Sequence, residues 1–327
     1  MFRTLSFAQI ALFCSKSSNI KSELRLAYLC LAGICIIWGT TFLAMRIGVM
    51  EFPPFLFAGM RQFFAGILLS GYLLLIRKTA FPTLAHLGRQ AFAGFLMITL
   101  GNGLVSWAEV YVPSGVAAII CSFMPVWMTL INLTINRSEL PNSLIVLGVF
   151  TGLGGIIMVF NEHLAAFVNA QYQLGIAFVF IASLAWALGS VMIKRSGQNS
   201  NPFLNAGLQM IFGSIGCFIL SFIFDDLTAV HWTSTTLFTL SYLVLVGSVA
   251  AFAMYGYALT KLPITIASLY SYVNPLVAVL LGWITLDEKL NPKIWIAMVV
   301  TVLGIYLVNR GYQMKSQKIM EPSKMKS

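Results

Sequence analysis

Long apolar stretches separated by short polar connections are the dominant pattern of this chain. Each stretch holds about twenty residues, the length that an α-helix needs to cross a bilayer core of roughly 30 Å. A backbone in lipid must satisfy its own hydrogen bonds, so these stretches predict helices. Ten spans are expected, at residues 26–46, 55–76, 91–110, 114–135, 142–160, 173–193, 203–224, 235–259, 263–285 and 292–309.

The composition agrees with an all-α membrane protein. Hydrophobic residues make up 59% of the 327 residues and charged residues only 9%, whereas a soluble domain carries about a quarter charged residues. In a soluble protein the formal charge of +10 would suggest nucleic-acid binding. Here the basic residues lie in loops and tails beside the apolar stretches, so we expect no nucleic-acid partner and interpret the charge as a signal of membrane orientation.

Basic residues are concentrated in every second connection. An even number of spans places both termini on one side, and we expect that side to be the cytoplasm. The outer connections then keep only Lys289 and Lys293, with Arg46 at a helix end and Arg61 inside a span. This distribution follows the positive-inside rule. It predicts a cytoplasmic N-terminal extension at 1–25 and a basic cytoplasmic tail at 311–327.

Cysteine and histidine show no metal or redox motif. The five cysteines (Cys14, Cys30, Cys35, Cys121 and Cys217) are odd in number and lack a C-x-x-C pair, so we interpret them as small core residues. The three histidines fall in predicted loops without a second ligand at metal spacing. The sequence also lacks a G-x-x-x-x-G-K-S/T phosphate loop. We therefore expect no cofactor, no metal and no ATPase.

The two halves of the chain repeat each other. A shift of 148 to 150 residues superimposes like residues across several spans: Trp38 on Trp186, Arg46 on Lys194, Pro113 on Pro263, Pro125 on Pro275 and Gly154 on Gly304. Five spans per half is an odd number, so the second half would enter the membrane from the opposite face. Inverted repeats of this kind are typical of secondary transporters, although duplication can also merely enlarge a scaffold. We expect five-helix repeats at 26–160 and 173–310.

Several segments carry a family resemblance: WGTTF at 38–42 with RIG at 46–48, PPFLFAGMRQFFAGILL at 53–69, GNGLVSWAE at 101–109, VPSGVAAI at 112–119 and SYVNPLVAVLLG at 271–282. In these segments, and over nearly all of 26–310, the chain resembles the EamA branch of the drug/metabolite transporter superfamily, and most of all its YedA-like permeases. The resemblance implies five plus five helices in the bacterial inner (plasma) membrane, export of small metabolites, and a central cavity between the halves. It also implies that the fifth and tenth helices pack together, which Gly148 and Gly152 would permit.

Two charges inside the predicted spans are candidate functional groups, because such charges are costly in a membrane. Arg61 lies roughly 10 Å below the outer surface at 1.5 Å per residue, and Glu109 closes the third span on the same side. The pair has two interpretations: an ion pair that locks the second and third helices, or a substrate or proton gate at the outer mouth. The second half carries Gln209 where the first has Arg61.

Polar and aromatic residues within the spans complete the substrate-pathway candidates. They are Trp38, Asn102, Trp107, Ser122, Gln209, Tyr257, Tyr270 and Asn274. Tyr270 and Asn274 are four residues apart and share a helix face. The alternative for each of these side chains is ordinary helix packing or anchoring at the membrane interface.

These features favour a secondary transporter that exports a small amphiphilic metabolite, such as an amino acid, a related compound or a drug, by alternating access. An ion gradient, for which protons are candidates, or the solute's own gradient would drive it. A facilitator of the same fold, a lipid-linked flippase and a non-transporting membrane sensor are the alternatives. An enzyme is not expected, since the spans lack paired catalytic acids or histidines at one depth. The oligomeric state is open, and a monomer is compatible with the sequence.

Overall fold

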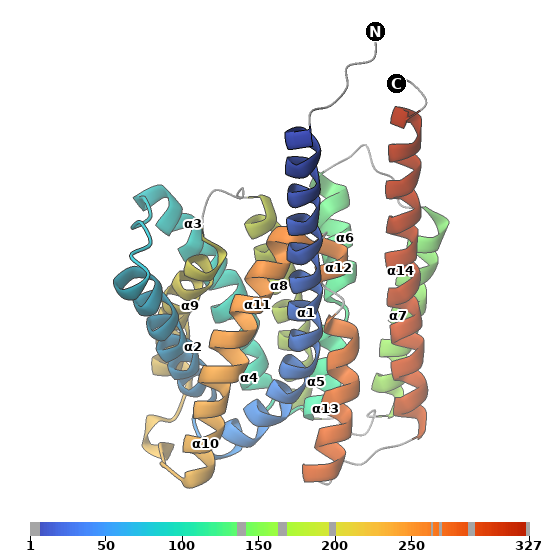
Figure 1. The fold of residues 1–327 in the computed structure, drawn as a ribbon. Helices are drawn as coiled ribbons and strands as arrows, with labels where there is room; N and C mark the ends of the chain where they lie inside the picture. The colour runs from blue at the N-terminus through green and yellow to red at the C-terminus, as the bar shows by residue number, and fades with distance from the viewer. Residues whose placement is uncertain are drawn as a thin grey trace.

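The computed structural model describes residues 7–135, 142–162, 169–195, 201–262, 264–267, 270–286 and 292–324. Every regular element in these ranges is a helix (Figure 1). The first half contains α1 (Phe7–Glu51), α2 (Pro54–Gly71), η1 (Tyr72–Ile76), α3 (Leu84–Gly94), η2 (Phe95–Gly103), α4 (Leu104–Ala108), α5 (Ser114–Cys121), α6 (Met124–Ile135) and α7 (Ser143–Glu162). The second contains α8 (Ala170–Arg195), α9 (Pro202–Phe224), η4 (Leu227–Ala229), α10 (Ser234–Tyr242), η5 (Leu243–Ala250), α11 (Ala251–Lys261), α12 (Ile264–Ala267), α13 (Tyr270–Leu286) and α14 (Pro292–Lys324).

Six helical stretches are long and apolar enough to cross a membrane. They are Ser22–Glu51, Pro54–Ile76, Leu84–Ala108, Ala170–Lys194, Pro202–Phe224 and Ser234–Lys261. Shorter apolar helices lie where the other four spans are expected, at Ser114–Met128, Ser143–Gly152, Val273–Leu286 and Trp295–Val308. The class predicted from the sequence, an all-helical membrane protein, is thus confirmed, and the count of ten spans stays a prediction.

Both terminal helices extend beyond their predicted spans. Helix α1 begins at Phe7, inside the expected N-terminal extension, and α14 continues through the basic tail to Lys324. The described ends of these two helices lie at the same end of the molecule, at the top of Figure 1. Residues 1–6 and 325–327, and the 287–291 connection with Lys289, lie outside the described residues.

Two predicted spans are each divided in the same way. The third span consists of α3, the π-helical η2 and α4, and the eighth of α10, the π-helical η5 and α11. A shift of 148 residues moves Phe95–Gly103 onto 243–251, almost the bounds of η5, Leu243–Ala250. The π-helical turns therefore recur at equivalent places in the two halves. Such turns are frequent at functional sites.

Glycines bring helices of the two halves into close contact. In the α2–α9 pair, a Cβ on Gly66 would lie 2.8 Å from the Gly207 carbonyl oxygen. In the α7–α14 pair, a Cβ on Gly148 would lie 2.5 Å from the Gly304 carbonyl oxygen. Helices α7 and α14 run side by side at the edge of the molecule (Figure 1). The expected packing of the fifth helix on the tenth is confirmed, and its physical reason is the missing side chain at the crossing.

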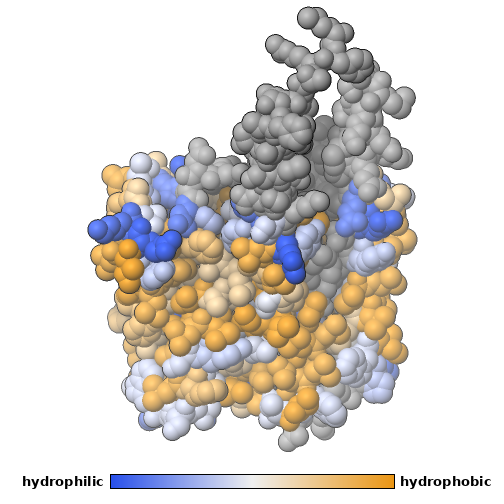
Figure 2. Space-filling view, in the orientation of Figure 1, coloured by the Kyte–Doolittle hydropathy of each residue, from blue (hydrophilic) through white to orange (hydrophobic). Residues whose placement is uncertain are grey.

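The surface has the distribution of polarity expected for a membrane protein. Figure 2 shows hydrophobic residues in a broad band, with hydrophilic residues gathered toward the upper and lower ends. Large apolar side chains such as Leu75, Phe222 and Phe238 are more than 70% exposed. Since contact with water would be unfavourable for so many apolar groups, this band is the surface that faces lipid.

Candidate functional site

A cavity of about 100 Å³ lies between the two halves of the chain. Helices α1 and α2, the η2–α4 segment and the α5–α6 pair line it from the first half, and α8, α11 and α13 line it from the second. Six of the predicted pathway residues contribute to the lining: Trp38, Arg61, Asn102, Glu109, Tyr270 and Asn274. These sequence-based candidates therefore converge on one place.

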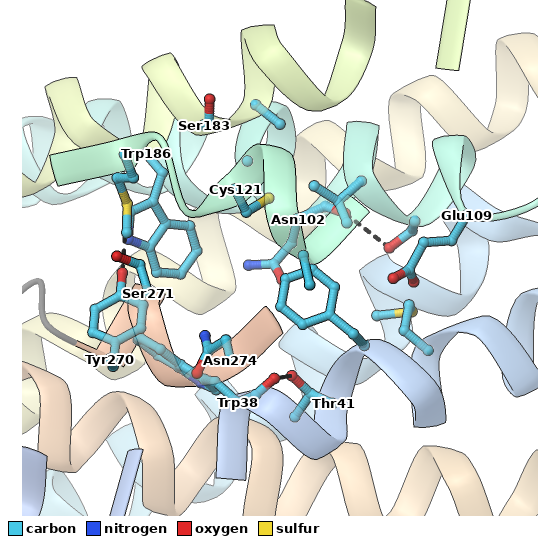
Figure 3. A pocket seen from close by; sticks show the side chains of 18 of the residues that line it. Trp38, Thr41, Asn102, Glu109, Cys121, Ser183, Trp186, Tyr270, Ser271 and Asn274 are labelled. Carbon is cyan, nitrogen blue, oxygen red and sulfur yellow. Dashed lines mark hydrogen bonds between the residues drawn. The ribbon is translucent and has the colours of Figure 1, made fainter. Parts of the chain in front are cut away.

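Aromatic rings form one end of the cavity. The ring of Trp38 meets Trp186 at a centroid distance of 5.5 Å, Tyr270 at 4.6 Å and Phe252 at 5.6 Å. Tyr255 lies behind them, 5.1 Å from Trp38. Rings in edge-to-face contact stabilise each other beyond the burial of their area. This wall is therefore a firm apolar surface, and its members Trp186 and Tyr270 lie at the left of Figure 3.

A carboxylate lies at the opposite end of the cavity from Trp186 and Tyr270 (Figure 3). It belongs to Glu109, whose side chain is completely buried and follows directly after α4. Arg46 of α1 donates to the Glu109 carbonyl oxygen and also to the carbonyl oxygen of Val112 at 3.3 Å. The cavity thus combines an apolar end with a charged end.

Arg61 also reaches the cavity, and its guanidinium is held by the other half of the protein. Its Nε donates to Ser248 Oγ at 2.8 Å and its Nη2 to the Gly247 carbonyl oxygen at 3.1 Å. Trp38 Nε1 donates to the same carbonyl at 3.2 Å. Both residues line the cavity, and the ion pair between Arg61 and Glu109 stays a prediction. In this structure a backbone carbonyl and a hydroxyl of the π-helical η5 accept from the buried guanidinium.

Amide and hydroxyl groups on the walls are hydrogen-bonded to other protein groups. Asn102 Nδ2 donates to the Met97 carbonyl oxygen at 3.4 Å, and Tyr270 Oη donates to Met124 Sδ at 3.4 Å. With its amide nitrogen turned toward α1, Asn274 donates to the Cys35 carbonyl oxygen at 3.1 Å and to that of Tyr270 at 2.9 Å. These bonds hold the polar side chains in place on the walls of the cavity.

Four predicted pathway residues lie elsewhere. Trp107 packs on Tyr111 and Phe178. Ser122 is buried and donates to the carbonyl oxygen of its own helix at Ile119, 2.5 Å away. Gln209 donates to Gln90 Oε1 at 2.6 Å, which ties α9 to α3. Tyr257 stacks on Phe203 with a centroid distance of 6.2 Å. In this structure these four residues make packing contacts between or within helices, as the alternative interpretation of the sequence expected.

Other lining residues escaped the sequence analysis. They include Thr41, Ser106, Cys121, Ser183, Phe252 and Ser271. Three of them had a usable signal: Thr41, Ser106 and Ser271 lie three or four residues from the predicted residues Trp38, Asn102 and Asn274, so each shares a helix face with one of them. The rest are common residue types in apolar helices, and only the packing distinguishes them.

A second cavity of about 560 Å³ opens at the lower end of the molecule and is lined by Glu51, Trp107, Tyr111, Asp225, Asp226 and His231 among others. Its carboxylates tie the connections of the two halves together. Asp225 accepts from the backbone N–H of Leu56 at 2.8 Å and so caps α2, and Glu51 accepts from Thr233 Oγ1 at 2.6 Å. Burial raises the pKa of Asp225, although the Leu56 N–H opposes this by stabilising the carboxylate.

The described part of the chain brings no three His, Cys, Asp or Glu side chains together as a metal site. What it contains is a helical membrane protein whose two halves enclose an amphiphilic cavity. Midplane cavities between repeats are the usual place for a solute in membrane transporters.

Comparison with known proteins identifies the family. The model of the EamA-like transporter family matches residues 25–161 and again 173–310, so the chain belongs to this family of transmembrane transporters. Over 300 residues it is 34% identical to the uncharacterized inner membrane transporter YedA of Escherichia coli K12, covering 89% of this chain and 94% of that protein. It is 24% identical over 274 residues to the uncharacterized transporter YoaV of Bacillus subtilis, covering 84% and 93%.

One solved structure, titled only as the crystal structure of a protein, shares the fold. The two superpose with a TM-score of 0.65 at 17% identity, over 90% of this chain and 98% of the other. The expected resemblance to EamA transporters and to YedA-like permeases is confirmed.

Proposed function

We propose that the protein is a secondary carrier of the inner membrane that exports small amphiphilic metabolites, such as amino acids or related compounds, by alternating access. The observation that carries this proposal is the central cavity, which both halves line and which has aromatic rings at one end and Glu109 at the other. A solute with an apolar body and a charged group matches this arrangement. An exchange of conformations between the two halves would expose the cavity to each side in turn.

The carrier would consist of ten membrane helices in two inverted repeats, 26–160 and 173–310. The paired π-helical segments η2 and η5 support a repeat, since they lie 148 residues apart. Reciprocal contacts support the inversion. A Cβ on Gly59 would meet Phe218, and a Cβ on Gly207 would meet Ser70. A shift of 148 relates Gly59 to Gly207 and Ser70 to Phe218, so each contact is the counterpart of the other with the two halves exchanged. Such an exchange of contacts is what a two-fold axis between the halves would produce.

Both termini would lie in the cytoplasm. The common end of α1 and α14 (Figure 1) is consistent with this orientation, as is the concentration of basic residues in alternate connections. A reporter that fluoresces only in the cytoplasm tests it. Fused after Lys78 it should fluoresce, and fused after Asn169 it should be dark. Fluorescence after Asn169 would rule out the ten-span topology.

Energy coupling to protons is part of the proposal. Glu109 is the candidate proton-linked group, because it is a buried carboxyl beside the solute cavity. Protein in vesicles should transport faster under an imposed pH gradient, and Glu109→Gln should lose this acceleration while keeping downhill exchange. Indifference of the unaltered protein to the gradient would make it a facilitator. A response that survives in Glu109→Gln would exclude this residue only.

The substrate is best sought by comparing the metabolites outside cells with and without the protein. We expect one or a few small amphiphilic compounds to accumulate outside only when the protein is present, and purified protein in vesicles to carry the same compounds. A change confined to membrane lipids would favour the flippase alternative. Unchanged metabolites together with altered gene expression would favour the membrane sensor.

A further inference from the structure

Each half of the chain contains a basic side chain that bonds to two backbone carbonyls of the same half. Arg46 of α1 donates to the carbonyl oxygens of Glu109 and Val112. Lys194 of α8 donates to those of Leu259 at 2.6 Å and Leu262 at 2.9 Å. The two bases are related by a shift of 148 residues, and their two pairs of acceptors by a shift of 150. Equivalent residues therefore form the same kind of contact in each half of the chain.

The acceptors have a physical reason to attract a cation. Helix α4 ends at Ala108 and α11 ends at Lys261, and the last carbonyls of a helix have no N–H partner within it. They also carry the negative end of the helix dipole. A base on the neighbouring helix satisfies these carbonyls and, in doing so, fixes the end of that helix to the connection that follows. We call these two contacts the Arg46 clamp and the Lys194 clamp.

The clamps lie at opposite ends of the molecule. Helix α1 descends in Figure 1, so the Arg46 clamp, in its last turns, lies at the lower end, where α4 also ends. Met45, which precedes Arg46, and Glu109, whose carbonyl oxygen is an acceptor in this clamp, both line the central cavity. Helix α8 ascends, so the Lys194 clamp lies at the upper end, where α11 finishes.

The Lys194 clamp continues a column of contacts that starts in the cavity. One turn below it, Ser190 Oγ and Tyr255 Oη share a hydrogen bond of 2.8 Å. The Tyr255 ring in turn lies 5.5 Å from Tyr270, which lines the cavity. The side chains of Leu259 and Leu262 are almost fully buried beside these groups. Separating α8 from α11 would therefore open a path from the cavity to the upper end.

We propose that the two clamps are the latches of the carrier: the Arg46 clamp closes the lower end of the cavity and the Lys194 clamp closes the upper end. The proposal rests on the alternating-access function given above and goes beyond it by naming the contacts that hold each end shut. Both clamps are formed in this structure, which on this proposal is the state with both ends closed. Opening either end breaks one clamp and leaves the other intact, and a solute therefore never meets a continuous channel.

Cys121 provides a natural reporter, because it lines the cavity and is half-buried. The full-length protein is prepared with Cys121 as its single cysteine, the other four being replaced by alanine. The rate of its modification by a membrane-impermeant methanethiosulfonate reagent is measured in right-side-out and in inside-out vesicles. Arg46→Gln should raise the rate roughly tenfold from one side only, and Lys194→Gln roughly tenfold from the opposite side only, since each loses charge-assisted hydrogen bonds.

Conservative exchanges and unrelated bases serve as controls. Arg46→Lys and Lys194→Arg retain the charge and should remain closed, so they test the proposal even where a glutamine variant fails to insert. Arg25→Gln and Arg89→Gln remove exposed bases that belong to neither clamp and should leave both rates unchanged. Clamps that only stabilise the fold would accelerate labelling equally from both sides.

Equal acceleration, acceleration from the same side in both variants, or no change in either would overturn the proposal. The outcome is separable from the proposed function. Opposite-sided labelling in a protein that carries no solute would retain the latches and refute the carrier. Transport by a protein whose labelling shows no side preference would support the carrier and refute the latches.

Discussion

The indole rings of Trp38 and Trp186 meet edge to face, with centroids 5.5 Å apart and planes at 89°. The two residues occupy equivalent positions in the halves of the chain, 148 residues apart. A residue can touch its own counterpart only near the axis that relates two repeats, so an axis between the halves would pass through this contact. The wall of the cavity is thus built where the two halves meet.

Truncation of Trp38 should therefore be strongly destabilising. Trp38→Ala removes a ring with only 6% exposure and should lower the free energy of unfolding by about 3–5 kcal/mol. Trp38→Phe retains most of the ring contacts and loses the hydrogen bond to Gly247, at a cost of about 1 kcal/mol. Thermal unfolding in detergent, followed by circular dichroism, measures both. Trp283→Ala, at a lipid-facing residue that is 52% exposed, is the control, and losses of equal size at the two tryptophans would contradict this account.

Arg61 and Ser248 should be energetically coupled. The Arg61 Nε–Ser248 Oγ bond of 2.8 Å predicts that Arg61→Gln and Ser248→Ala together cost less than the sum of the single changes, by about 0.5–3 kcal/mol. A double-mutant cycle on thermal stability measures this coupling. Ser214 is equally buried but donates to its own helix, so Ser214→Ala should be additive with Arg61→Gln. If the losses of stability in Arg61→Gln and Ser248→Ala were strictly additive, the hydrogen bond would not hold the arginine in place.

The crossing of α7 and α14 should not tolerate a methyl group on one of its glycines. A Cβ on Gly304 would lie 2.2 Å from the backbone nitrogen of Gly152, whereas a Cβ on Gly154 would meet no atom within 4 Å. We expect Gly304→Ala to lower the yield of monodisperse protein in size-exclusion chromatography, because backbone would have to move. Gly154→Ala should be neutral, or stabilising by up to about 1 kcal/mol through helix propensity. The two glycines are equivalent by the shift of 150, so similar losses in both variants would mean that the helices do not pack as described.

Asp225 should make stability depend on pH in the acidic range. Burial raises its pKa above the ordinary value of 3.8, so the folded chain binds this proton more tightly than the unfolded chain. The contribution of this proton to the free energy of unfolding is fully present at a pH below the ordinary pKa. It is lost as the pH rises through the pKa of the folded state. Asp225→Asn keeps an acceptor for the Leu56 N–H and should remove this slope, as measured by thermal unfolding between about pH 4 and 7.

The neighbouring Asp226 is the matched control for this prediction. Hydrogen bonds from Thr228 lower its pKa, so its contribution has the opposite sign and is lost as the pH falls. Asp226→Asn should therefore change the slope in the other direction. Asp225→Ala removes the cap of α2 and should lower stability at every pH by about 0.5–2 kcal/mol. An unchanged slope in Asp225→Asn would show that this carboxyl titrates as it does in the unfolded chain.

Much of this protein follows from its sequence alone. Hydrocarbon cannot hydrogen-bond to a backbone, so apolar stretches of about twenty residues had to be helices, and the six long apolar helices agree. The repeat shift alone pairs Trp38 with Trp186 and Arg46 with Lys194. Charge inside the spans marked Arg61 and Glu109, which both reach the cavity.

The tertiary structure decided which atoms meet. Depth in the membrane placed Arg61 near Glu109, but the guanidinium turns to Ser248 and Gly247, because a π-helical turn in the other half offers acceptors at that place. Similarly, Gln209 and Tyr257 have the polarity of pathway residues and still pack between helices. A linear pattern gives the depth and the helix face of a side chain. Its partner depends on how helices far apart in sequence rotate against one another, and that rotation is set by the close-packed fit of all side chains at once.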